Sequence, residues 1–99
     1  MSDREAPVFD ALHVPPEAFD KGGVEVLRAV IVDGALHVSL RRAFDDPEAF
    51  GMMIADITRH VGRIYADKFP EAQTVERIRS IYDSEMDAPT DPGTTSALS

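Results

Sequence analysis

Two stretches rich in apolar residues lie near the centre of the chain, on either side of an Asp-Gly pair. Residues 24–32 read VEVLRAVIV, residues 33–34 are the Asp-Gly pair, and residues 35–44 read ALHVSLRRAF. An Asp-Gly pair between two apolar runs is the strongest short-range signal for a hairpin, because both residues of the tight turn need a positive φ. The pattern predicts an antiparallel hairpin with a two-residue turn, in which Val32 faces Ala35.

The two faces of this hairpin differ, because successive side chains of a strand point to opposite sides of the sheet. The first face is apolar and carries an ion pair at its far end: Leu27, Ala29, Ile31, Leu36, Val38 and Leu40, with Glu25 opposite Arg42. The second face mixes valines with polar residues: Val24, Val26, Val30 and Val32, with Arg28, His37, Ser39 and Arg41. Four valines exceed what a face in water usually carries, so this valine face is a predicted interface.

A long helix is predicted after the hairpin. Asp46 can cap its first turn, Pro47 suits the first helical position and Glu48 complements the positive end of the helix dipole. An apolar stripe at helical spacing then continues until Phe69-Pro70 ends it: Phe50, Met53, Ile54, Ile57, Val61, Ile64 and Tyr65. We expect this helix to cover the apolar face of the hairpin.

A second helix and a third strand are expected at the two ends of this core. Val75, Ile78, Ile81 and Tyr82 recur at helical spacing and predict a C-terminal helix. Alternating apolar residues between positions 8 and 14 indicate a short strand. Because two strands alone are marginally stable in water, the sheet needs either this strand or a partner subunit.

Composition divides the chain into one domain and two ends. Residues 87–99 read DAPTDPGTTSALS and have too few apolar side chains to offset the entropy lost on ordering. We therefore expect a flexible N-terminus at residues 1–7, a single domain over residues 8–86 and a disordered tail over residues 87–99. The predicted fold class is α+β, an antiparallel hairpin or three-stranded meander packed by one long helix and followed by a second C-terminal helix.

Charge and cysteine content exclude several kinds of function. The 99 residues include 18 acidic and 10 basic side chains, which give a net charge of −8. This charge repels phosphate backbones and anionic lipids, so neither nucleic acid nor a membrane is an expected partner. The absence of cysteine excludes disulfides, thiol nucleophiles, iron–sulfur clusters and thiolate zinc sites. No apolar run approaches the ~18 residues of a membrane span and residues 1–7 precede no signal-peptide core, so the expected location is cytoplasmic.

One candidate for chemistry lies on the predicted long helix. Asp56 and His60 are four residues apart, so the carboxylate can orient the imidazole as a general base or a ligand requires. Arg63 continues the same side of the helix, and Arg41 at the end of the second strand is a candidate for holding an anion. The alternative is a solvated face with local charge pairing, which is favoured because the sequence fixes no nucleophile or second ligand pair nearby.

Metal and nucleophilic sites are not expected. His13, His37 and His60 lack the HxH and HExxH spacings that are typical of metal sites. Ser39 lies within a predicted strand, where neither an oriented base nor an oxyanion hole is supplied. No metal and no other cofactor is therefore predicted.

Four short motifs give the chain a resemblance to a known family. They are GGVEVLR at residues 22–28, HVSLR at residues 37–41, DPEAFG at residues 46–51, and Asp56 with Arg59 and His60. In these motifs the chain resembles a family of small bacterial proteins known only as a domain of unknown function, and the resemblance covers roughly residues 8–86. The resemblance implies a bacterial, cytoplasmic protein and carries no assigned activity, cofactor or catalytic residue. Gly51 costs a helix about 0.8 to 1 kcal/mol relative to alanine, and close packing against the sheet or a partner would explain it.

Two functions from different classes remain. The first is a non-enzymatic protein-interaction module that acts as a homodimer through the valine face or an exposed strand edge, because a small chain with acidic ends buries little surface alone. The second is a small-molecule-binding protein or enzyme with a site at Asp56 and His60, flanked by Arg63 and Arg41. The first interpretation is favoured, with a protein partner or a second copy as the ligand, and enzymatic activity is the less expected outcome.

Overall fold

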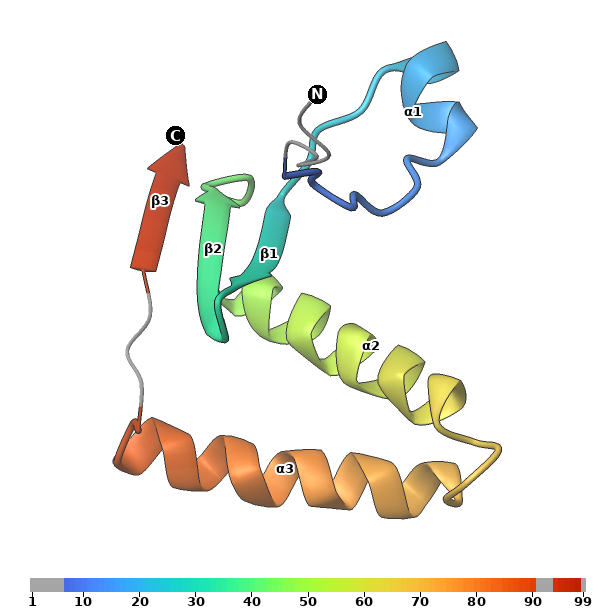
Figure 1. Ribbon diagram of the computed structural model, residues 1–99, viewed down its shortest axis with the longest axis vertical. Helices are drawn as coiled ribbons and strands as arrows, with labels where there is room; N and C mark the ends of the chain where they lie inside the picture. Colours follow the sequence, from blue (N-terminus) through green and yellow to red (C-terminus); the bar gives the residue numbers. More distant parts are fainter. Residues whose placement is uncertain (1–6, 91–93, 99) are drawn as a thin grey trace, which may run out of the picture.

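The computed structural model describes residues 7–90 and 94–98, and its elements belong to the α+β class that the sequence predicts. In chain order they are α1 (Pro16–Lys21), β1 (Leu27–Val32), β2 (Ala35–Arg41), α2 (Glu48–Ile64), α3 (Glu71–Asp87) and β3 (Thr94–Leu98). The three strands form one sheet, and the two long helices lie in a pair beside it (Figure 1). The hairpin and the two helices of the prediction are therefore confirmed.

The hairpin has the predicted register. Val32 faces Ala35, Ile31 faces Leu36, and the ladder continues in step to the other end of the strands. Asp33 and the glycine after it have φ values of 52° and 80°, as a tight two-residue turn between twisted strands requires. The alternation of side chains along both strands therefore produces the apolar face and the valine face at the expected positions.

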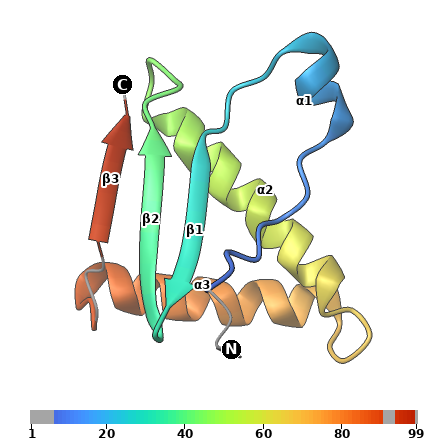
Figure 2. The same ribbon diagram turned by 45° about the horizontal axis from the view of Figure 1, so that its top comes forward.

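We expected the third strand in the N-terminal segment, but it lies near the C-terminal end of the chain. Residues 7–15 are irregular and lead into α1, whereas residues 94–98 pair in parallel with β2 and give the strand order β1-β2-β3 (Figure 2). Parallel neighbours need a long crossover connection, and α2 and α3 together provide it. We expected disorder over residues 87–99, but α3 continues to Asp87 and the main chain of β3 extends the sheet.

The ends of the two long helices follow local rules. Oδ1 of Asp46 accepts a hydrogen bond from the backbone N–H of Glu48 at 3.0 Å, which satisfies one free donor of the first turn of α2. Pro47 already has helical φ and ψ values of −60° and −20°. Pro70 directly precedes α3, so the two helices form a hairpin with a short connection.

Close packing between α2 and α3 centres on Gly62. This glycine is buried, and a Cβ placed on it would lie 3.5 Å from the carbonyl oxygen of Glu71 and 3.5 Å from Cγ2 of Val75. The small residue lets the two helix backbones approach each other. Val61 and Val75 are half-buried around this crossing point.

The sheet and the helix pair do not share a core. The expectation that the long helix covers the apolar face of the hairpin is wrong for the single chain, because α2 lies against α3 and makes no close contact with the described strands. Within residues 7–90 no hydrophobic side chain is buried. The radius of gyration is 16.7 Å, compared with about 13 Å for a compact domain of this length.

The turn of the hairpin gives a first prediction. Replacing Gly34 with valine puts a β-branched residue at a φ of 80°, and we expect a loss of about 1 to 2 kcal/mol in the free energy of unfolding. Urea unfolding at fixed protein concentration measures the loss. Asp33→Asn is the matched control, since asparagine tolerates a positive φ and should leave the midpoint nearly unchanged. Equal midpoints for Gly34→Val and the unaltered protein would contradict the turn assignment.

Candidate functional site

Asp56, His60 and Arg63 lie in a row along one exposed side of α2. Nε2 of His60 is 3.3 Å from Oδ2 of Asp56, and Nη1 of Arg63 is 3.1 Å from Nδ1 of His60. The spacings of four and three residues bring these side chains together on one side of a helix. Nε of Arg63 also lies 3.9 Å from Oε1 of Glu71, so the row continues to the start of α3.

The imidazole of His60 forms one hydrogen bond in this row. An arginine only donates, so Nδ1 of the imidazole accepts from Arg63, whereas Nε2 faces the Asp56 carboxylate at ion-pair distance. The lone pair of Nδ1 is then engaged by Arg63 and does not serve a substrate proton or a metal ion. The side chains of His60 and Asp56 are 59% and 71% exposed, so water screens their interaction. The geometry is that of local pairing on a solvated face.

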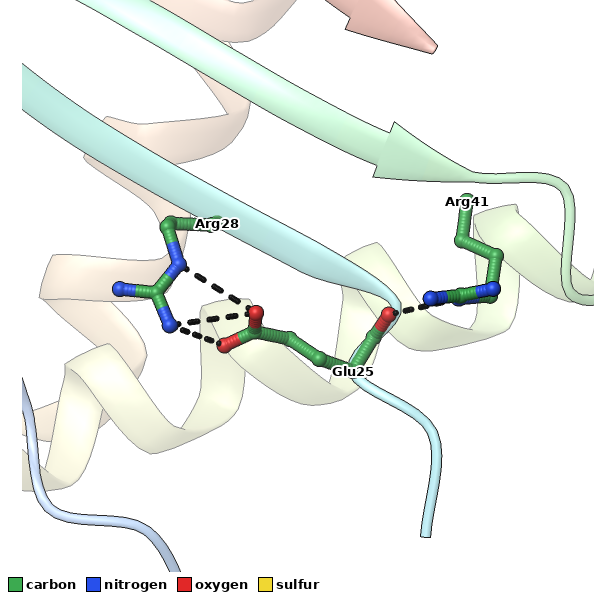
Figure 3. A network of polar contacts seen from close by, with 3 residues as sticks. All are labelled: Glu25, Arg28 and Arg41. Carbon is green, nitrogen blue, oxygen red and sulfur yellow. Dashed lines mark hydrogen bonds and ion pairs between the residues drawn. The ribbon is translucent and has the colours of Figure 1, made fainter. Parts of the chain in front are cut away.

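Arg41 does not join this row. Its Nε donates to the carbonyl oxygen of Glu25 at 3.2 Å (Figure 3). Its backbone N–H donates to the carbonyl oxygen of Val26 at 2.9 Å. The guanidinium therefore ties the end of β2 to the residues that enter β1. The four sequence-predicted ligand residues thus divide into a row of three on α2 and one residue at the edge of the hairpin.

We predicted an ion pair between Glu25 and Arg42. In the structure Glu25 forms its ion pair with Arg28 instead. Nη2 of Arg28 is 2.9 Å from Oε2 of Glu25, and Nε and Nη2 also donate to Oε1 at 3.3 and 3.2 Å (Figure 3). The reason is that β1 begins at Leu27, so Glu25 has no place in the strand ladder opposite Arg42. The guanidinium carbon of Arg28 lies 5.3 Å from the centre of the Phe9 ring, which packs on it as a cation–π pair.

The contact between Arg28 and Phe9 lies on the valine face, among its apolar side chains. Val26 and Val30 are half-buried, whereas Val24 and Val32 are exposed. The N-terminal segment reaches this face through the ring that stacks on Arg28. The four valines are therefore divided between a partly covered middle and two open ends.

The three histidines do not form a ligand cluster with the acidic residues. Within the part of the chain that the structure describes, no three His, Asp or Glu side chains are grouped closely enough to hold a metal ion. His13 lies in the irregular N-terminal segment, His37 on β2 and His60 on α2. Among the described helices, none has both the length and the apolar composition needed to cross a membrane.

A cavity of about 580 Å³ lies between α2 and α3, and we call it the helix groove. Its walls include Val61, Tyr65, Phe69, Thr74, Ile78 and Tyr82. Arg77 also borders it, with its guanidinium carbon 4.9 Å from the centre of the Phe69 ring. The groove is thus largely apolar, with one basic group stacked at its edge.

Thr74 is the most unusual residue of the helix groove. It is only 7% exposed, and its Oγ1 has no hydrogen-bond partner among the described residues. A buried hydroxyl without a partner costs roughly 1 to 3 kcal/mol. Sequence analysis missed the groove, although Gly62 inside an otherwise regular helix is a signal of close helix packing.

One protein-family model matches most of this chain. The family model of a domain of unknown function, DUF5076, matches residues 11–90. The chain belongs to the DUF5076 family. The resemblance to a small uncharacterised family that the four motifs indicated is thereby confirmed.

One solved structure shares nearly the whole length of this DUF5076 chain. It is named as a "putative pyruvate dehydrogenase" from the photosynthetic bacterium Rhodopseudomonas palustrus CGA009. The two are 35% identical with a TM-score of 0.75, and the match covers 95% of this chain and 100% of the other. None of the curated proteins matches the chain.

The exposed row on α2 gives the second prediction. Asp56→Asn alters one screened contact and His60→Gln alters two, all on a solvated face, so we expect each to change the free energy of unfolding by no more than about 0.5 kcal/mol. Urea unfolding of both variants at one protein concentration measures this change. A loss of several kcal/mol from either one would mean that the row is buried in the assembled protein.

Proposed function

We propose that this protein is a non-enzymatic interaction module that is stable only as a homodimer. The observation that supports this most is the lack of any buried hydrophobic side chain within residues 7–90. Burial of apolar surface is the dominant favourable term in folding, so a chain with no core of its own needs a partner to supply one. A second copy is the partner that is always present at the same concentration.

The surface area supports the same proposal. The chain exposes 8859 Å², whereas a compact protein of 10.9 kDa exposes about 5600 Å². The excess is on the order of 3000 Å², which is at or above what each partner buries in a large obligate dimer. The area that the isolated chain leaves exposed is therefore sufficient for a stable dimer.

Gly51 fits a partner better than it fits the chain's own sheet. A Cβ built on this residue would meet nothing within 4 Å, so no described segment explains why the helix carries a glycine there. Close approach of a second chain would explain the cost of about 0.8 to 1 kcal/mol that glycine adds to a helix.

The hairpin has two faces that are candidates for the dimer interface, the apolar face and the valine face. The valine face is interrupted by Arg28 and Arg41, and burying their charges is costly unless the partner pairs them. The apolar face carries no charged residue between its two ends, and Ile31 on it is 74% exposed. The apolar face therefore fits a dimer interface better, and the valine face stays the second candidate.

The name of the solved relative suggests an enzyme, but the residues of this chain do not fit one. Oxidative decarboxylation of pyruvate needs an electron sink such as thiamine diphosphate, whose diphosphate group needs a cation or several basic side chains. The described residues include no group of three metal-ligating side chains, and the one basic side chain at the helix groove, Arg77, is stacked on Phe69. We therefore do not carry this activity over to the chain.

Association gives the third prediction. Native mass spectrometry should detect twice the chain mass of 10.9 kDa, and unfolding should depend on protein concentration. For a dimer that unfolds to free chains, each tenfold dilution lowers the apparent free energy of unfolding by about 1.4 kcal/mol. A monomeric mass together with a concentration-independent unfolding midpoint would overturn the proposal.

The fourth prediction separates the two faces with neighbouring residues. Ile31 and Val32 are adjacent β-branched residues of β1 on opposite faces of the hairpin, 74% and 49% exposed. We expect Ile31→Lys to weaken dimerisation at least ~100-fold, because it puts a charge into an apolar interface twice in each dimer. Val32→Lys should change the dissociation constant less than ~10-fold, and sedimentation equilibrium compares the two. Dissociation by Val32→Lys alone would instead assign the interface to the valine face.

A further inference from the structure

Two apolar surfaces of the same chain are only partly covered. The first is the apolar face of the hairpin, here called the hairpin face, to which Leu27, Ile31, Leu36 and Leu40 contribute. The second is the helix groove between α2 and α3. Neither surface touches the other within the described chain, because α2 makes its close contacts with α3 and none with the strands.

These two surfaces are similar in length. A strand of six residues spans about 20 Å, and a helix of 17 residues spans about 25 Å. Two helices on one face of an antiparallel hairpin form an ordinary two-layer α+β core. The chain therefore contains both layers of such a core but holds them apart.

The connection between β2 and α2 keeps the two layers separate. The rings of Phe44 and Phe50 pack edge to face with centroids 5.0 Å apart, and Asp46 caps the helix within the same elbow. In Figure 1 the two helices lie below the hairpin, and in Figure 2 α2 passes behind β1 while α3 crosses behind the lower ends of the strands. Although the helices lie on one side of the sheet, neither makes a close contact with a strand.

We infer that two copies exchange these layers, so that the α2–α3 pair of each chain covers the hairpin face of its partner. This inference rests on the proposed homodimer and specifies how the dimer is built. A twofold axis makes the two contacts identical, closes the assembly and leaves neither apolar surface bare. The exchange also places apolar side chains of a second chain against the largely apolar walls of the helix groove.

Isotope-filtered NMR on mixed dimers tests the exchange. Chains labelled with ¹³C and unlabelled chains are unfolded together and refolded, so that about half of the dimers contain one of each. We expect nuclear Overhauser effects between the methyl groups of Ile31 and Leu36 in labelled chains and the rings of Tyr65 and Tyr82 in unlabelled chains. A sample of labelled chains alone is the control, because it contains no unlabelled ring protons.

Each other outcome overturns the exchange in a distinguishable way. Contacts between the hairpin face and the helix groove within one chain only would show that α2 folds back onto its own sheet. Contacts between two hairpin faces across chains would keep the homodimer and replace exchange by like-on-like packing. A monomeric mass in the same sample would overturn the homodimer together with the exchange.

Discussion

The elbow between β2 and α2 determines how the rest of the chain is stabilised. Phe44 and Phe50 pack against each other there, Asp46 accepts a hydrogen bond from the first turn of α2, and the helix that follows makes no close contact with the strands. Because the elbow separates the layers, the strands stabilise one another by main-chain hydrogen bonds and the helices meet at Gly62, but no apolar side chain of residues 7–90 leaves water completely. Each half contains regular secondary structure, and neither half contains a core.

Secondary structure without a core has little stability of its own. A hairpin is marginal in water, and helices of 17 residues depend mostly on tertiary packing of an apolar side. In the homodimer that we propose, folding and association are therefore the same event, and the free energy of unfolding includes that of dissociation. Replacing Ile31 by lysine would then act on stability and on dimerisation together, whereas Gly34→Val acts on the turn within one chain.

The hairpin was predictable because its signals are local. The Asp-Gly turn fixes the register, and the alternation of side chains then fixes both faces. The strand β3 was not predictable, since its residues pair through the main chain with a strand about sixty positions earlier and need no apolar pattern. At the candidate site the spacing of Asp56 and His60 predicts their contact, but not that Arg63 occupies the other imidazole nitrogen. The sequence did not show that the helices stay apart from the sheet. An amphipathic pattern indicates that one side of a helix is apolar, but it does not indicate whether that side packs on the same chain or on another.

The distribution of charge is compatible with close association of two strongly acidic chains. A net charge of −8 on each copy opposes dimerisation, and the cost depends on where the charges lie. Residues 41–82, which include most of the helix pair, carry seven basic and seven acidic side chains, and residues 83–99 carry four acidic and no basic ones. The hairpin face is uncharged and the helix groove has Arg77 at its edge, so the surfaces that we bring together avoid the acidic ends of the chain. The remaining repulsion acts between exposed charges, where salt screens it within about 10 Å at ordinary ionic strength.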